Sequence, residues 1–265
     1  MNETIQAPIK SETYNWILLR GLSREVRHWG AFPNILKSKN ERYRVFPLEL
    51  PGNGKKFGID SKSSLIENVE DLRKEFLELR KQNSGNFGVI AISLGGMVAL
   101  TWADKYPDDF KDLVVLNSSA GDLSSVFKRL QPGAMKEIFK LICSSTYNDN
   151  IYDREKTILK MTTTMTPLTD ELIKKWADFG QEYPMTRKNV FRQLYSALKF
   201  VVPKRLKCNT LILSGAKDSL CHPQCSEIIA KLYNSKSAVH PEAGHDLTLD
   251  DPNWLASQIA ENIHL

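Results

Sequence analysis

Short apolar runs recur along the chain and alternate with stretches whose apolar residues return every three or four positions. The runs lie at residues 15–20, 43–48, 87–92, 113–117, 210–214 and 237–240. Most are continuous rather than alternating, which is typical of parallel strands buried on both faces. The stretches between them predict helices, with Leu65, Val69 and Leu72 on one face of the clearest example. We therefore predict an α/β fold, a mostly parallel doubly wound sheet with right-handed crossovers.

Two helix starts carry recognisable capping signals. Ser64 followed by Glu67 predicts a capping box. Asp251 and Pro252 predict an N-cap and a first helical residue, ahead of a helix that ends the sequence.

About ninety residues between the fourth and fifth predicted strands contain no strand pattern. Amphipathic spacing predicts helices at residues 126–142, 152–161, 169–179 and 187–200. This segment is too long for a connection and too apolar for a disordered linker. We predict a helical cap at residues 121–203, inserted after the fourth strand and lying over the C-terminal ends of the strands. The core then comprises residues 1–120 and 204–265.

The composition is that of an ordinary globular protein, with 42% apolar and 25% charged residues. The polar N-terminus resembles no signal peptide, and no apolar run reaches the roughly 18 residues of a membrane span. Four cysteines are too few and too irregular for a disulfide framework. We expect a cytoplasmic protein without a membrane span.

The net charge of +5 is concentrated in the predicted cap, where 13 Lys and Arg face 9 Asp and Glu. Such a segment is either a solvated helical surface or a docking face for an acidic partner. No basic run with interleaved aromatic residues favours nucleic-acid binding. Cys221, His222 and Cys225 are three possible metal ligands within five residues, but no second ligand cluster accompanies them. Packing at a helix start explains them better than zinc.

Ser93 stands where a buried strand gives way to a helix. The run 87–92 ends in this serine, Gly95 and Gly96 follow, and an apolar helical pattern begins. The glycines keep bulk away from a tight turn that would present the hydroxyl at its apex. Ser93 is the candidate nucleophile.

A serine nucleophile needs a base to take its proton and an acid to orient that base. Asp218 follows the fifth strand and His245 follows the last one, so both lie at the same sheet edge as Ser93. Asp122, after the fourth strand, is the alternative acid, while Asp246 is expected to stabilise its loop. His28, His222 and His240 are less well placed for the base.

The remaining requirement is an oxyanion hole made of backbone N–H groups. Leu94 follows the nucleophile at a helix start, and its N–H is one candidate donor. Leu22, in the loop after the first strand, supplies the second candidate.

Four segments together resemble the α/β-hydrolase superfamily, in particular its capped serine esterases. They are the loop 18–21, the turn 50–54, the Ser93 turn, and the His245 loop with Asp250, Asp251 and Pro252. The order Ser, Asp, His is that of the superfamily. Arg20 replaces the histidine common before the loop glycine, Ala91 replaces the first elbow glycine, and only about fifteen residues precede the first strand, so the usual N-terminal hairpin looks missing or reduced.

The resemblance implies a serine hydrolase that cleaves a carboxylic ester or thioester through an acyl-enzyme. Small carboxylesterases and pimeloyl-carrier-protein methyl esterases are similar at this level. A lyase or perhydrolase with the same triad, or a binding protein with little turnover, remains open. A nucleophilic serine argues against dehalogenases and epoxide hydrolases, which place Asp at this position. No metal or organic cofactor is implied.

Substrate choice is expected in a pocket between cap and sheet. Its candidate walls are Leu22, Trp29, Phe127, Leu130 and Trp176, although the sequence favours core packing over a pocket role for each of them, because apolar helix faces usually pack. Arg24 and Arg27 either hold a substrate carboxylate or form surface salt bridges. The basic cap is compatible with an acidic acyl carrier protein as partner. The acyl chain, the alcohol, the pathway and the oligomeric state are not determined by the sequence.

Overall fold

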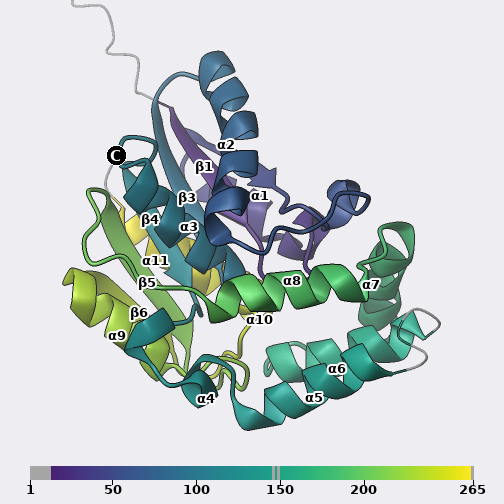
Figure 1. Cartoon of the computed structure of the whole chain (residues 1–265). Coiled ribbons are helices and arrows are strands. Elements are labelled where there is room, and N and C mark those ends of the chain that lie inside the picture. Colours follow the sequence, from purple (N-terminus) through teal and green to yellow (C-terminus); the bar gives the residue numbers. More distant parts are fainter. Residues whose placement is uncertain (1–12, 145–146, 148–149, 264–265) are drawn as a thin grey trace, which may run out of the picture.

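The fold is a parallel sheet with helices on both faces (Figure 1). The computed structural model describes residues 13–144, 147 and 150–263. Within these residues one sheet has the strand order β2-β1-β3-β4-β5-β6, and all five pairings are parallel. The strands are β1 (Tyr14–Leu19), β2 (Tyr43–Leu48), β3 (Asn86–Ile92), β4 (Asp112–Leu116), β5 (Asn209–Gly215) and β6 (Lys236–His240). The predicted parallel, doubly wound sheet is confirmed.

Alternate residues of the central strands enter two separate apolar cores. In β1, Ile17 and Leu19 join the core beneath α2 (Leu65–Gln82) and α3 (Leu94–Lys105). Trp16 and Leu18 join the opposite core, formed with α1 (Phe32–Lys39) and α11 (Pro252–Asn262). These two layers of helices are visible in front of and behind the sheet in Figure 1. A continuous apolar run is therefore required, because each strand is buried on both faces.

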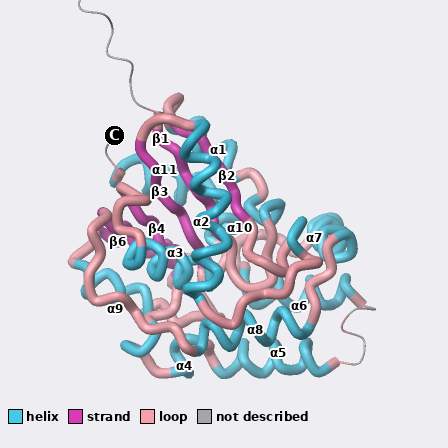
Figure 2. Tube along the Cα trace, turned by 45° about the horizontal axis from the view of Figure 1, so that its top comes forward, coloured by secondary structure: helices cyan, strands magenta, loops and turns pink. Residues whose placement is uncertain are grey.

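The segment between β4 and β5 is helical, as predicted. It contains α4 (Val126–Arg129), α5 (Pro132–Cys143), α6 (Ile151–Thr162), α7 (Asp170–Glu182) and α8 (Arg187–Leu198). After β5 come α9 (Gln224–Tyr233), β6 and the short α10 (Leu247–Asp250), followed by α11. Figure 2 shows α5 to α8 grouped at one end of the strands, where the loops after β1, β3 and β6 also lie.

The prediction of one helix over residues 126–142 is wrong in its middle. The chain leaves the helical conformation at Leu130 (φ −139°, ψ 108°) and is still extended at Gln131 (φ −64°, ψ 147°), after which α5 starts with Pro132 as its first residue. The proline ring disfavours helical geometry in the residue before it, and Pro132 has no N–H to continue the hydrogen-bond ladder.

The two predicted caps differ in outcome. The side chain of Asp251 accepts a hydrogen bond from the Trp254 N–H at 2.9 Å, so that N-cap is confirmed. Ser64 is the N-cap of α2, but its side chain makes no capping hydrogen bond, so the predicted capping box is absent there.

Candidate active site

Ser93 occupies a strained turn between β3 and α3. Its backbone has φ 57° and ψ −121°, a conformation that non-glycine residues rarely adopt. The Ser93 N–H donates to the carbonyl of Leu116 (2.9 Å), and the Ser118 hydroxyl donates to the carbonyl of Ser93 (2.8 Å). These bonds from the end of β4 hold the turn in place.

Close packing around the turn requires glycine. A Cβ at Gly95 would lie 2.5 Å from the carbonyl oxygen of Leu19, and one at Gly96 would lie 2.7 Å from the Ser118 hydroxyl. The two glycines therefore let α3 start directly against the ends of β1 and β4.

His245 and Asp218 meet at the same edge of the sheet. The Nδ1 atom of His245 lies 2.7 Å from Oδ2 of Asp218, and both side chains are buried. The other oxygen of Asp218 accepts backbone N–H bonds from Leu220 (2.8 Å) and Cys221 (2.9 Å). These donors stabilise the carboxylate and fix its orientation toward the imidazole. The alternative acid, Asp122, instead accepts a bond from the Val202 N–H at 2.9 Å.

Asn117, which sequence reasoning did not single out, ties the loops of the site together. It lies just after β4 with a positive φ of 44°. Its amide donates to the carbonyls of Gly244 (3.1 Å) and His245 (2.7 Å), and its oxygen accepts the Gly215 N–H (2.9 Å). A polar residue directly after a buried strand, of a type that tolerates positive φ, was the available signal.

The loop after β1 lies directly against Ser93. A Cβ at Gly21 would be 3.0 Å from Cβ and 3.5 Å from Oγ of Ser93, so only glycine leaves this approach open. Leu22 is the next residue, and Leu94 is the first residue of α3, where backbone N–H groups have no partner within the helix. Both candidate oxyanion donors therefore belong to backbone that borders Ser93.

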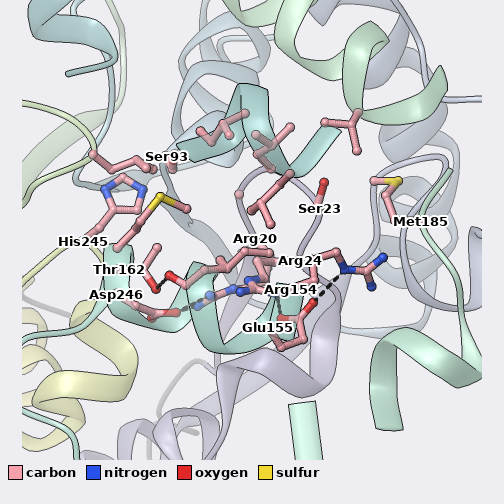
Figure 3. A pocket seen from close by; sticks show the side chains of 18 of the residues that line it. Arg20, Ser23, Arg24, Ser93, Arg154, Glu155, Thr162, Met185, His245 and Asp246 are labelled. Carbon is pink, nitrogen blue, oxygen red and sulfur yellow. Dashed lines mark hydrogen bonds and ion pairs between the residues drawn. The ribbon is translucent and has the colours of Figure 1, made fainter. Parts of the chain in front are cut away.

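Two cavities meet at Ser93. Both are lined by Leu22, Ser93, Ile138, Leu220 and His245. The larger, about 370 Å³, continues between α3, α5 and α8 along mostly apolar side chains, and we call it the apolar cavity. The smaller, about 100 Å³, continues toward α6 and includes Arg20, Arg24, Arg154, Glu155 and Asp246; we call it the charged cavity (Figure 3).

Of the predicted wall residues, Leu22 lines both cavities and Leu130 lines the apolar one. The other three assignments are wrong. Trp29 is fully buried beneath the site, stacked on Phe32. Trp176 packs edge-on against His28 inside a core of the helical segment, and Phe127 is 64% exposed on α4.

The arginines in and near the loop after β1 form ion pairs whose partners the sequence did not predict. Arg20 binds both oxygens of Asp246 (3.2 and 2.6 Å), and both residues are buried. Burial opposes ionisation of Asp246, yet Arg20 and the Thr248 hydroxyl hold the pKa of this carboxyl below its usual value. Asp246 thus stabilises its loop, as expected. Arg24 is buried and pairs with Glu155, whereas Arg27 pairs with Glu25 and Glu182 nearer the surface.

Cys221 and Cys225 lie at the start of α9, as the packing interpretation expected. Both thiols are free and buried, and a hydrogen bond from Cys221 lowers the pKa of Cys225 to about 6. In the part of the chain that the structure describes, no group of three or more His, Cys, Asp or Glu side chains is arranged to hold a metal ion. No helix among those residues is long and apolar enough to cross a membrane.

Residues 16–258 match the model of the alpha/beta hydrolase family. The chain belongs to this family. The match, together with the parallel sheet, confirms the predicted fold class and the predicted superfamily.

A curated relative from Wigglesworthia glossinidia brevipalpis is 26% identical over 92% of this chain and 91% of its own length. It is named pimeloyl-[acyl-carrier protein] methyl ester esterase, and a relative from Nitrosomonas europaea with the same name matches 35% of this chain at 28% identity. These names agree with the enzyme class predicted from the sequence, an ester hydrolase.

Solved structures of low sequence identity share the fold. The 2-hydroxy-6-oxo-6-phenylhexa-2,4-dienoate hydrolase from Rhodococcus sp. strain RHA1 superimposes with a TM-score of 0.75 at 17% identity, covering 94% of this chain and 90% of its own. A thermophilic esterase from Thermogutta terrifontis reaches 0.71 at 20% identity, with 94% and 89% covered.

Proposed function

We propose that this protein is a serine hydrolase that cleaves carboxylic esters through an acyl-enzyme, with Ser93 as nucleophile, His245 as base and Asp218 as orienting acid. The observation that carries the proposal is the buried 2.7 Å contact between His245 Nδ1 and Asp218, together with a cavity that both His245 and the strained Ser93 turn line. That contact leaves the Nε2 atom of His245 for proton exchange with the serine.

The reaction follows from these roles. Ser93 Oγ attacks the ester carbonyl carbon while His245 takes the hydroxyl proton, and the N–H groups of Leu22 and Leu94 bind the developing oxyanion. His245 then gives its proton to the departing alcohol, which leaves an acyl-serine. Water attacks this ester with His245 again as base, and the acid is released. The chemistry needs no metal or organic cofactor.

The apolar cavity supports an acyl chain as one part of the substrate. Leu94, Met97, Leu130, Met135 and Leu194 line it together with Leu22. Burial of an alkyl chain against such walls contributes about 0.8 kcal/mol per CH₂ group. A medium-length acyl group fits a volume of about 370 Å³.

An acyl carrier protein is the proposed macromolecular partner. The two curated relatives are named for a carrier-bound substrate, and residues 121–203 carry 13 Lys and Arg against 9 Asp and Glu. We expect a pimeloyl methyl ester on its carrier to be hydrolysed with a higher kcat/KM than the free ester. Salt should remove this preference, because exposed charges are screened. A preference that salt leaves intact would speak against a charge-based docking face.

The cytoplasm is the proposed location, supported by the four free cysteines.

The proposed reaction is tested with 4-nitrophenyl esters from acetyl to lauroyl. Ser93→Ala should lower kcat/KM by about 10⁴-fold or more, whereas Ser219→Ala, which changes an exposed serine beside Asp218, should retain activity. A phosphonate probe should add one adduct, on Ser93. Adduct formation without turnover would favour a binding protein, and products other than acid and alcohol would favour a lyase or perhydrolase.

A further inference from the structure

We propose that the charged cavity binds the carboxylate of an anionic ester against Arg24, so that an ester with a free carboxylate a few bonds from its scissile carbonyl is hydrolysed with a higher kcat/KM than an uncharged ester of the same shape. The inference rests on the proposed function for its position beside Ser93, and it names one substrate class for that site. Figure 3 shows the side chains involved.

Arg24 has a hydrogen-bonding group left over. Its Nη1 atom donates to Oε2 of Glu155 at 2.6 Å, and its guanidinium lies 4.9 Å from the ring centre of Trp176. The Nη2 atom is buried, and none of the described residues accepts a hydrogen bond from it. The residue as a whole is 7% exposed. A buried donor without an acceptor is costly, so this nitrogen is suited to an acceptor from a ligand.

The charges around Arg24 do not balance. Glu155 is shared between Arg24 and Arg154, whose Nε lies 3.5 Å from its Oε1. These three side chains are buried and together carry one net positive charge. Their neighbour Arg20 cannot release its carboxylate to them, because Asp246 is bound to it through both oxygens. Glu25 pairs with Arg27, and neither Glu25 nor the buried Glu49 lines this cavity.

A bound carboxylate would correct this imbalance. A buried charge is strongly disfavoured unless it is paired, and a carboxylate matches the planar guanidinium geometry. The positive charges of these arginines also affect the pKa of the neighbouring His28. Burial, reinforced by the charges of Arg24 and Arg20, lowers its pKa well below the usual value, so it does not add a further positive charge.

The small size of the charged cavity limits the kind of substrate that it can hold. The charged cavity is about 100 Å³ and contains Gly21, Ser93 and His245 together with Arg24. Apolar side chains also line this cavity, among them Ile138, Leu141, Ile158 and Met161. A short methylene spacer between ester and carboxylate would pack against these side chains. The apolar cavity takes the group on the other side of the ester.

Two matched pairs of esters test the proposal. Mono-4-nitrophenyl glutarate against 4-nitrophenyl valerate places the carboxylate on the acyl side. The pair 4-acetoxybenzoate and 4-acetoxytoluene places it on the alcohol side. The wild-type enzyme should prefer the anionic member of at least one pair. Arg24→Gln should lower that kcat/KM ratio roughly 10- to 100-fold, as expected for the loss of a hydrogen bond between charged groups.

Two further variants keep the result interpretable. Arg27→Gln changes a neighbouring arginine that does not line the charged cavity, and the ratio should stay as in wild type. Glu155→Gln raises the net charge beside Arg24 and should increase the ratio. A ratio that Arg24→Gln leaves unchanged, or that Arg27→Gln lowers equally, would overturn the proposal.

Binding to Ser93→Ala separates this proposal from the proposed reaction. Calorimetry with glutarate should detect binding that valeramide does not show and that Arg24→Gln abolishes. If wild type hydrolyses no ester but this binding persists, the reaction is wrong and the subsite stands. If esters are hydrolysed but glutarate does not bind, water alone occupies the charged cavity and the subsite is wrong.

Discussion

The two cavities beside Ser93 differ in what their walls are made of and where those walls come from. The apolar cavity lies between α3 and the amphipathic helices α5 and α8, whereas the charged cavity combines the loop after β1 with α6. An apolar wall discriminates gradually, since each methylene group contributes about 1 kcal/mol. A buried arginine discriminates sharply between substrates that carry a hydrogen-bond acceptor for it and substrates that do not. Under the proposed function, the two cavities would therefore give Ser93 two different kinds of substrate selectivity.

The largest expected loss of activity should be the same for substrates that occupy either cavity. Asp218→Asn retains an acceptor for the Leu220 and Cys221 N–H groups but no longer holds His245 in the required tautomer. We expect kcat to fall by about 10⁴-fold for neutral and anionic esters alike. Steady-state kinetics on both ester classes measure this. Asp122→Asn is the matched control, and a large loss there instead would reassign the acid.

A substitution in the lining of the charged cavity should lower the free energy of unfolding, because this cavity contains buried ion pairs. Arg20→Met leaves the Asp246 carboxylate buried without its partner, which should lower the free energy of unfolding by about 3–5 kcal/mol. The pKa of Asp246 is lowered in the folded state, so its contribution is present above the ordinary Asp pKa and is lost as pH falls through the folded value. Urea unfolding between pH 7 and acid pH measures both effects.

The variant should therefore show a weaker loss of stability on acidification than the wild type. Removing both partners, in Arg20→Met with Asp246→Leu, should recover much of the stability at neutral pH. An unchanged pH dependence in Arg20→Met would mean that the ion pair does not control the titration of Asp246.

The smallest expected effect is a change in chain-length preference, confined to substrates that occupy the apolar cavity. Leu130→Trp adds bulk to a wall of the apolar cavity, so kcat/KM for a decanoyl ester should fall about 10-fold relative to a butyryl ester. Phe127→Trp, which changes an exposed residue of the short helix α4 that ends just before Leu130, should leave the ratio unchanged. A loss that is equal for both chain lengths would place Leu130 outside the acyl site.

The sheet and the order of its loops could be predicted because they follow from local patterns. Continuous apolar runs mark strands buried on both faces, and Ser93, Asp218 and His245 each follow one of them. The positions of Trp29 and Trp176 could not be predicted, because the sequence pattern of an apolar residue that lines a cavity is the same as that of one that packs in a core. The two tryptophans instead lie under Arg20 and Arg24.

Long-range polar partners were equally out of reach. Arg24 pairs with Glu155, which lies 131 positions later in the sequence, and no sequence spacing predicts that pair. Asn117 likewise acts through the Gly244 and His245 carbonyls, which reach it only once β4, β5 and the His245 loop are assembled.

The Arg20–Asp246 pair also bears on how the protein matures during synthesis. It connects the loop beside the nucleophile to the loop that carries the base, two segments separated by 226 positions. A chain leaving the ribosome with its N-terminal part first already contains Ser93 and the β1 loop, but neither the base nor the carboxylate that anchors that loop. If Ser93 and His245 have the proposed roles, the nascent protein stays inactive until translation has passed Asp246, and a product truncated before His245 contains the proposed nucleophile without its base.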